Sequence, residues 1–283
     1  MANVLSRNIA MAFGLAMLGG CAIALDEASI FRPDESSRRA MDAPLTLDGE
    51  DALPAGMQLR HSRVPARFGT VATSLATTGS DRLIVHCGGN ASDRKTDAVR
   101  SIGKASLFGD VLVFDYPGYG DSGGAPVAAD FAETARVIAA HVEALPYDEV
   151  MVWGLSLGGF ICGEIVGQSP KVSAVIYEAT ARSARDAASA ATPLYAKPFV
   201  RVNIADSLSQ YDTAAALDGF DGRVVVLGAG QDRQLPVKLS RQLAEALERR
   251  GRDVVYLEFD EAGHLSIPAA DGFRARIVEA VER

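Results

Sequence analysis

Residues 151–159, Met-Val-Trp-Gly-Leu-Ser-Leu-Gly-Gly, decide the fold that this sequence is expected to adopt. Through the pattern Gly-x-Ser-x-Gly they join the apolar run 150–154, typical of a buried strand, to helix-forming residues that begin at Phe160. Glycines suit this place because a sharp strand-to-helix turn strains the central residue and crowds the neighbouring Cβ positions. Such a turn lifts the Ser156 hydroxyl above the sheet at a helix N-terminus, where partial positive charge stabilises a developing anion. Ser156 is therefore the candidate nucleophile, and a glycine-rich turn without a chemical role is the alternative.

Around this turn the chain alternates between short apolar runs and helix-like stretches. The apolar runs predict strands buried on both faces of a parallel sheet, at residues 82–86, 111–115, 150–154, 174–177, 223–227 and 254–259. Two further runs at 57–64 and 68–75 predict a leading antiparallel pair, and helices are expected at 130–144, 160–168 and 236–249. This order indicates an α/β fold, a doubly wound domain over residues 57–283 with helices on both faces of a mostly parallel sheet.

Residues 178–222 interrupt that alternation. They contain alanine-rich, charged helical pieces and two prolines, Pro193 and Pro198, between two predicted sheet strands. A small cap over the strand ends is expected from this segment.

A serine hydroxyl needs a base to become nucleophilic at neutral pH, and four histidines are available. His264 follows the last predicted strand and precedes the C-terminal helix, which fits the chain order serine, acid, histidine of one hydrolase architecture. His141 falls within a predicted helix, His61 lies far from the strand ends, and His86 is expected to shape the loop that follows it. His264 is therefore the candidate general base, and an ordinary loop histidine is the alternative.

The third member is expected to be a carboxylate that holds the imidazole in one tautomer and stabilises its charged form. Asp232 follows the strand at 223–227 and a glycine turn, and Pro236 then opens a helix. Glu178, directly after the strand that ends at Tyr177, is the competing candidate. A purely turn-forming role for Asp232 also stays open.

An oxyanion formed at the carbonyl would need two backbone N–H donors. The residue after the nucleophile, Leu157, is expected to supply one of them. The loop at residues 86–90, His-Cys-Gly-Gly-Asn, is expected to supply the other, since glycines let the backbone approach a substrate closely. The sequence leaves open which N–H points inward, so Gly89 and Asn90 are named together.

Residues 57–283 resemble α/β-hydrolases of the serine-aminopeptidase-like and palmitoyl-thioesterase-like branch. The resemblance rests on Gly-Gly-Asn-Ala at 88–91, on Phe-Asp-Tyr-Pro-Gly-Tyr-Gly-Asp-Ser-Gly-Gly at 114–124, on 154–159, and on Asp232 and His264 in that order. It implies cleavage of a carboxylic ester or thioester through an acyl-enzyme, with 114–124 as a turn that closes the mouth of the site. A peptidase or amidase on the same three residues, and a non-enzymatic envelope lipoprotein, are the alternatives. Relatives commonly show His-Gly-Asn, whereas this chain has Cys87 and an added glycine between His86 and Asn90, which leaves the register of the second oxyanion donor open.

The first residues form a separate pattern. Arg7 is followed by an apolar and small-residue run to Leu25, and Leu-Gly-Gly-Cys at 18–21 resembles the lipobox of bacterial lipoproteins. That resemblance implies a signal peptide at 1–20, acylation of Cys21, a tether at 21–56, and attachment to a membrane of the bacterial cell envelope, facing the periplasm or the exterior. An ordinary signal peptide with a chance cysteine and an uncleaved membrane anchor are the alternatives.

Composition narrows the partners. The formal net charge is −8 and the basic residues form no cluster, so a nucleic-acid partner is not expected and a small-molecule or acyl substrate is. No metal-ligand spacing and no phosphate-binding loop is present, so neither a metal nor another cofactor is expected. Cys87 and Cys162 are either small buried residues or a disulfide pair, and the oligomeric state is left open.

Overall fold

The computed structural model describes residues 21–34, 45–191 and 200–282. The predicted signal peptide at 1–20, and Pro193 and Pro198 of the predicted cap, lie outside the described residues.

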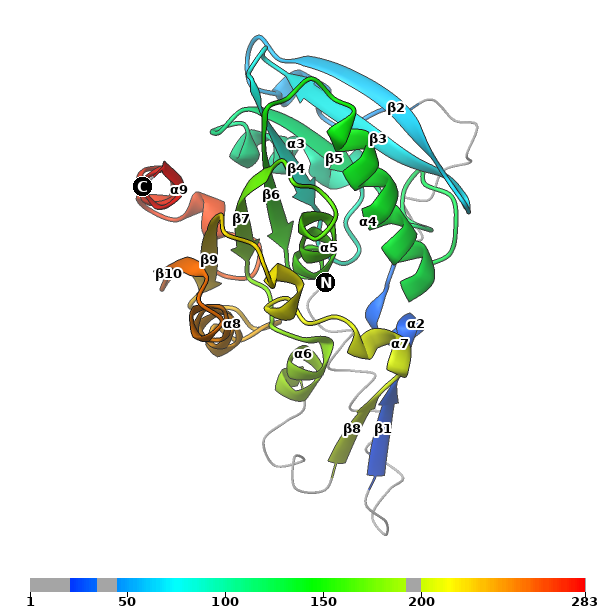
Figure 1. The fold of residues 1–283 in the computed structure, drawn as a ribbon, viewed down its shortest axis with the longest axis vertical. Coiled ribbons are helices and arrows are strands. Elements are labelled where there is room, and N and C mark those ends of the chain that lie inside the picture. Colours follow the sequence, from blue (N-terminus) through cyan, green and yellow to red (C-terminus); the bar gives the residue numbers. More distant parts are fainter. Residues whose placement is uncertain (1–20, 35–44, 192–199, 283) are drawn as a thin grey trace.

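Eight strands form one sheet, in the order β10-β9-β7-β6-β4-β5-β3-β2 (Figure 1). They are β2 (Gln58–Ala66), β3 (Gly69–Thr77), β4 (Arg82–Cys87), β5 (Asp110–Phe114), β6 (Glu149–Leu155), β7 (Val172–Glu178), β9 (Arg223–Ala229) and β10 (Asp253–Phe259). Strand β3 runs antiparallel to both β2 and β5, and the other neighbouring pairs are parallel. The predicted antiparallel pair and the mostly parallel sheet are therefore confirmed.

Helices cover both faces of the sheet. They are α3 (Arg94–Ala105), α4 (Ala128–Glu143), α5 (Gly158–Val166), α8 (Lys238–Arg249) and α9 (Phe273–Glu282). Alternation along the strands divides the core, because Val150 and Val152 of β6 pack with α4, α5 and α8 whereas Met151 and Trp153 pack with α3 and α9. The chain crosses from β5 on one side of β4 to β6 on the other, and such a reversal opens a crevice at the carboxyl ends of the strands.

The cap segment 178–222 contains α6 (Ala184–Ala191), β8 (Val200–Ile204), α7 (Asp206–Ser209) and the 3-10 turn η3 (Ala215–Leu217). Strand β8 pairs in parallel with β1 (Cys21–Leu25), from the other end of the chain, and both lie below the main sheet in Figure 1. The N-terminal segment is therefore joined to the cap.

The described parts of the predicted tether, residues 21–34 and 45–56, contain more structure than the poorly packed pieces that were expected. They contain β1, α2 (Glu27–Ile30) and η2 (Glu50–Ala52), and the side chain of Phe31 belongs to the main core with 2% of its surface exposed. The difference arises because one aromatic side chain can be buried without any hydrophobic period around it in the sequence. Within the described ranges no helix is long and apolar enough to cross a membrane.

Candidate active site

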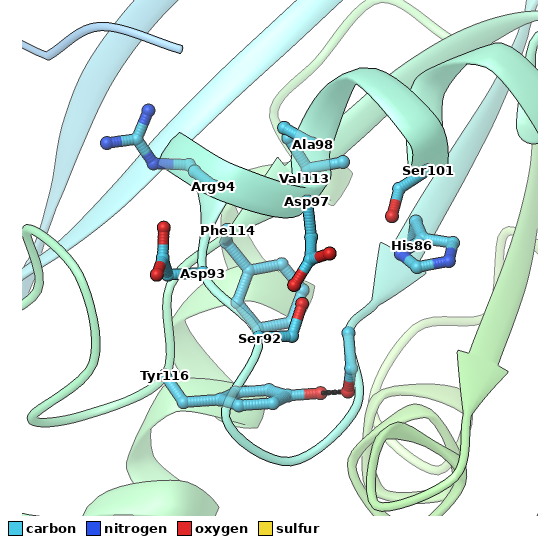
Figure 2. Close-up of a pocket in the computed structure, with 11 residues that line it drawn as sticks. His86, Ser92, Asp93, Arg94, Asp97, Ala98, Ser101, Val113, Phe114 and Tyr116 are labelled. Atoms are coloured by element: carbon cyan, nitrogen blue, oxygen red, sulfur yellow. Dashed lines mark hydrogen bonds between the residues drawn. The ribbon is translucent and has the colours of Figure 1, made fainter. Parts of the chain in front are cut away.

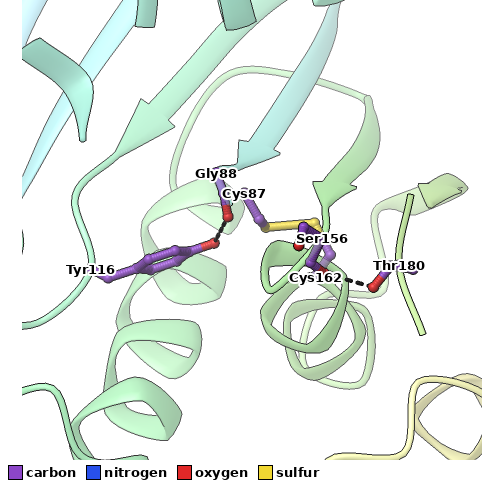
Figure 3. The surroundings of a disulfide bond; sticks show 6 residues. All are labelled: Cys87, Gly88, Tyr116, Ser156, Cys162 and Thr180. Atoms are coloured by element: carbon purple, nitrogen blue, oxygen red, sulfur yellow. Dashed lines mark hydrogen bonds between the residues drawn. A yellow bond between two sulfur atoms is a disulfide. The ribbon is translucent and has the colours of Figure 1, made fainter. Parts of the chain in front are cut away.

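Ser156 occupies the predicted turn between β6 and α5. Its backbone has φ +53°, a left-handed conformation that is rare and strained for a residue with a Cβ. The turn is held by its backbone: the Ser156 N–H donates to the Glu178 carbonyl at 2.9 Å, and the Ser156 carbonyl accepts from Thr180 Oγ1 at 2.6 Å (Figure 3). Strained serines at such turns expose the hydroxyl at the start of the following helix.

Gly158, the last glycine of the motif, explains the close packing behind Ser156. A Cβ at this position would lie 2.1 Å from the Cys87 carbonyl oxygen and 2.6 Å from that of Gly88. No real Cβ atom approaches backbone so closely, so only glycine allows the end of β4 to pack against the start of α5. The predicted oxyanion loop and the nucleophile turn are thus in direct contact.

Asp232 and His264, from the loops after β9 and β10, are brought together by the fold. His264 Nδ1 lies 2.6 Å from Asp232 Oδ2, and the two side chains are 1% and 9% exposed for the acid and the imidazole respectively. Asp232 Oδ1 accepts the N–H groups of Gln234 at 2.8 Å and Leu235 at 2.9 Å, which fixes the carboxylate. The pair stands at the carboxyl ends of its strands, the same edge of the sheet from which Ser156 projects.

Glu178, the competing acid, has other partners. Its carboxylate forms a buried ion pair with Lys104 of α3 and accepts the indole N–H of Trp153 at 2.8 Å. Burial lowers the pKa of the Lys104 ammonium, and the adjacent Glu178 carboxylate opposes that shift. The sequence offered no signal for this pair, because Lys104 lies 74 residues away along the chain. Glu178 therefore has a structural role, in which it links the sheet to α3.

The loop after β4 places Gly89 beside the nucleophile turn, and Asn90 follows it in the chain. Gly89 is buried, and a Cβ added to it would lie 3.7 Å from the Leu155 side chain. The Gly88 carbonyl accepts from Tyr116 Oη at 2.7 Å. Among the hydrogen bonds of the described residues, none uses the backbone N–H of Leu157, Gly89 or Asn90. All three predicted oxyanion donors therefore keep their N–H groups available, and the register between Gly89 and Asn90 stays open.

Cys87 and Cys162 form a disulfide that links the end of β4 to α5, next to Ser156 (Figure 3). Of the two possibilities that the sequence left open, the structure adopts the bridge. Both cysteines are fully buried, and the bridge joins residues 75 apart in the sequence.

Removing this disulfide is expected to lower the free energy of unfolding by about 2–4 kcal/mol, since a cross-link closing a loop of this length restricts the unfolded chain. The measurement is urea denaturation of wild type against the double variant Cys87→Ala/Cys162→Ala. As a check on the bridge, the unreduced, denatured wild type should present no thiol beyond Cys21, and reduction should release two more. Two extra thiols before reduction would contradict the bridge.

Glu164, in the last turn of α5, carries a buried carboxyl. Its Oε2 has no hydrogen-bond partner within the part of the chain that the structure describes, and burial raises its pKa from 4.5 to about 7. The unfolded chain ionises this group near pH 4.5 whereas the folded protein keeps it protonated up to about pH 7. Stability is therefore lost as the pH rises through this window, and the full cost applies above it.

Glu164→Gln is accordingly expected to raise the free energy of unfolding at pH 8 by about 3 kcal/mol and to leave it nearly unchanged at pH 4. Glutamine imitates the neutral carboxyl, so it removes the cost of ionising a buried acid. Denaturation at the two pH values measures the difference, and an equal effect at both would refute the raised pKa.

A small cavity lies behind the oxyanion loop, lined by residues that include His86, Asp93, Asp97, Ser101 and Tyr116 (Figure 2). Its volume of about 10 Å³ leaves room for about one water molecule. His86 is 2% exposed, and burial lowers the pKa of its imidazole well below the usual range, so it is held neutral. His86 therefore serves the packing behind the loop. No group of three or more potential metal ligands occurs in the described ranges.

Comparisons with known proteins agree with this architecture. A family model described as the alpha/beta hydrolase fold matches residues 83–211. An uncharacterized protein of Mycobacterium tuberculosis is 27% identical over 181 residues, which are 62% of this chain and 62% of that protein. An uncharacterized protein of Caenorhabditis elegans is 31% identical over 107 residues, covering 37% of this chain and 22% of its own length. The chain thus spans less than two thirds of these relatives.

Solved structures extend the likeness over nearly the whole chain. An esterase of Pyrococcus furiosus superposes with a TM-score of 0.65 at 15% identity, covering 90% of this chain and 98% of the esterase. An acylaminoacyl peptidase of Pyrococcus horikoshii gives a TM-score of 0.62 at 15% identity, over 81% of this chain and 41% of the peptidase. At such identities the likeness concerns the fold alone. The chain has the α/β-hydrolase fold, and residues 83–211 are similar to the family that the model describes.

Proposed function

We propose that the chain is a serine hydrolase that cleaves carboxylic ester or thioester bonds through Ser156, His264 and Asp232. The α/β-hydrolase fold, with esterase and peptidase structures among its neighbours, supports a serine-hydrolase-like activity. The observation that carries the proposal is the left-handed Ser156 at the start of α5, on the same sheet edge as the hydrogen-bonded His264 and Asp232. A strained serine at the same edge of the sheet as an acid-oriented imidazole suits nucleophilic acyl transfer, in which the imidazole takes the hydroxyl proton.

In the first half of the proposed reaction, Ser156 Oγ attacks the carbonyl carbon while His264 Nε2 takes the hydroxyl proton. Asp232 accepts a hydrogen bond from His264 Nδ1–H. This bond keeps Nε2 free as the base and stabilises the imidazolium once it forms. The N–H groups of Leu157 and of Gly89 or Asn90 hold the oxyanion. His264 then returns the proton to the leaving alcohol or thiol, and an acyl ester on Ser156 remains.

In the second half, His264 removes a proton from a water molecule, and the resulting hydroxide attacks the acyl carbon. The same N–H groups hold the second oxyanion. When this tetrahedral intermediate breaks down, the carboxylic acid leaves and Ser156 Oγ takes back a proton from His264. No cofactor is needed for either half.

The proposal is tested by reacting the folded protein with a fluorophosphonate probe and locating the adduct by peptide mass spectrometry. We expect phosphonylation of Ser156, and none after heat denaturation, because the reaction needs the assembled base and oxyanion donors. An adduct spread over several serines, or one equally abundant in the denatured protein, would refute the proposed nucleophile.

A peptidase or amidase acting through the same residues is the second candidate, favoured by the acylaminoacyl peptidase among the structural neighbours. Matched acyl esters, thioesters and anilides of increasing chain length separate the two. We expect kcat/KM for the esters or thioesters to exceed that for the anilides, and the reverse order would favour the peptidase.

We also propose that the chain is anchored to a membrane of the bacterial cell envelope through acylated Cys21. The support is the Leu-Gly-Gly-Cys pattern at 18–21 behind an apolar run. Two or more acyl chains give stable anchoring where one gives only marginal binding. Radiolabelled palmitate should be incorporated by the wild type expressed in a bacterium and not by Cys21→Ala. Equal labelling of both would refute the anchor.

A further inference from the structure

The side chain of Asn90 joins the candidate oxyanion loop to a segment from the far N-terminal part of the chain. Its Oδ1 accepts the Arg32 N–H at 2.9 Å, and its Nδ2 donates to the Ile30 carbonyl at 2.6 Å. The amide therefore binds the backbone on both sides of Phe31, in the manner of a neighbouring strand. Tyr119 Oη donates to the same Oδ1 at 2.8 Å, which ties this junction to the turn at 114–124.

Phe31 holds the segment in place from its other side. Its ring stacks on Phe131 of α4 at 4.1 Å between centroids and meets Tyr211 of the cap edge-on at 6.0 Å. The ring is 2% exposed. Residues 26–32, which we call the N-terminal clasp, thus bridge the cap, α4 and the loop at 88–91.

Hydrogen bonds within the clasp hold its own conformation. Asp26 caps α2 by accepting the Ser29 N–H at 2.9 Å, and Ser29 in turn accepts the Arg32 Nε–H on its carbonyl at 3.1 Å. Just before it, Leu25 accepts the Ala205 N–H at 2.9 Å on the cap. A segment held at both ends and in the middle can fix the position of whatever it binds.

We propose that the N-terminal clasp is part of the active site: through Asn90 it sets the position from which the loop at 88–91 offers its N–H to the oxyanion. This inference rests on the proposed function. It makes Arg32 and Phe31 positioning residues, which act on the reaction through Asn90 and touch no reacting atom. The segment that leads to the proposed anchor would then be required for turnover as well as for attachment.

The sharpest test compares Arg32→Pro with Arg32→Ala in the full chain. Both lose the guanidinium, but only proline removes the N–H that Asn90 accepts. Phe31 has φ −86° and ψ 110°, the extended conformation that a residue before proline adopts, so its backbone already suits the substitution. For an active ester, we expect kcat of Arg32→Pro to be about tenfold below that of Arg32→Ala, because small displacements of catalytic groups cost this much or more. KM should change little, since oxyanion donors act mainly in the transition state.

A second pair separates positioning from loss of stability. Phe31→Ala and Phe108→Ala each remove a buried aromatic ring. Phe108 is 7% exposed and lies just before β5, at the edge of the sheet opposite to the strand carboxyl ends. We expect both to lower the melting temperature, and only Phe31→Ala to lower kcat. Equal kcat values for Arg32→Pro and Arg32→Ala would refute the proposed positioning role of the clasp. Equal losses of kcat in Phe31→Ala and Phe108→Ala would refute it as well.

Amide hydrogen exchange of residues 88–92 decides the same question without turnover. Exchange there should be faster in Arg32→Pro than in Arg32→Ala, and unchanged exchange would overturn the clasp. If the wild type cleaves no ester, thioester or amide, the proposed function fails, whereas the exchange comparison still tests the clasp. The two failures are therefore distinguishable.

Discussion

Ser156→Ala is expected to lower kcat for ester hydrolysis by about 10⁵- to 10⁶-fold, the loss seen when a nucleophile is removed from a set of groups that act as one unit. The reason is geometric. The left-handed turn at φ +53° presents this residue alone at the start of α5, and alanine leaves the imidazole of His264 with no hydroxyl to deprotonate. The measurement is kcat with a chromogenic ester, for wild type and variant at matched concentrations of folded protein.

Ser106→Ala serves as the matched control. Ser106 is the C-cap of α3, at the edge of the sheet away from the strand carboxyl ends, and its hydroxyl donates to the Gly103 carbonyl. We expect its kcat to stay within about twofold of wild type, as is usual for surface substitutions away from special features. A Ser156→Ala protein that kept more than about one hundredth of the wild-type rate would contradict the proposed nucleophile.

Local patterns in the sequence were enough to predict the fold. The turn around Ser156 could be predicted because strand, glycines and helix are contiguous, and their geometry follows from residues a few positions apart. The parallel strands could be predicted because burial on both faces leaves continuous apolar runs. Asp232 and His264 were named from their places after strands, and the fold brings them into one hydrogen bond.

Contacts between distant segments could not be predicted in the same way. The burial of Phe31 depends on Phe131 and Tyr211, and nothing in residues 21–56 indicates that such a site exists. The pairing of Cys87 with Cys162 depends on the close approach of β4 and α5, which a spacing of 75 residues does not reveal. Lys104 meets Glu178 only because α3 packs against the sheet, where it lies on β4 and β5. Such contacts belong to the tertiary structure, where one side chain can decide the outcome without leaving a periodic signal.

Asp232→Asn is expected to lower kcat by about 10⁴-fold, and it decides which of two carboxylates orients the base. An amide at this position would offer Nδ2–H where His264 needs an acceptor, so the imidazole would be held in the wrong tautomer and its charged form would lose its counter-ion. The bonds from the N–H groups of Gln234 and Leu235 need only an acceptor oxygen, which asparagine retains, so the fold should be kept. The measurement is kcat across pH with an ester substrate, beside the melting temperature of the same preparation.

Glu178→Gln is the matched control, and it should behave in the opposite way. Removing the Glu178 charge leaves Lys104 buried without its counter-ion, which typically costs about 3–5 kcal/mol of stability. We expect the variant to melt at a lower temperature and, below that temperature, to keep kcat within a few-fold of wild type. The reason is that the Glu178 carboxylate binds Lys104 and Trp153, and neither of these bonds involves His264. If Glu178→Gln instead lost activity about 10⁴-fold while Asp232→Asn stayed active, the acid would be Glu178. The Asp232–His264 bond would then have a structural role only, so this one pair of substitutions assigns both carboxylates.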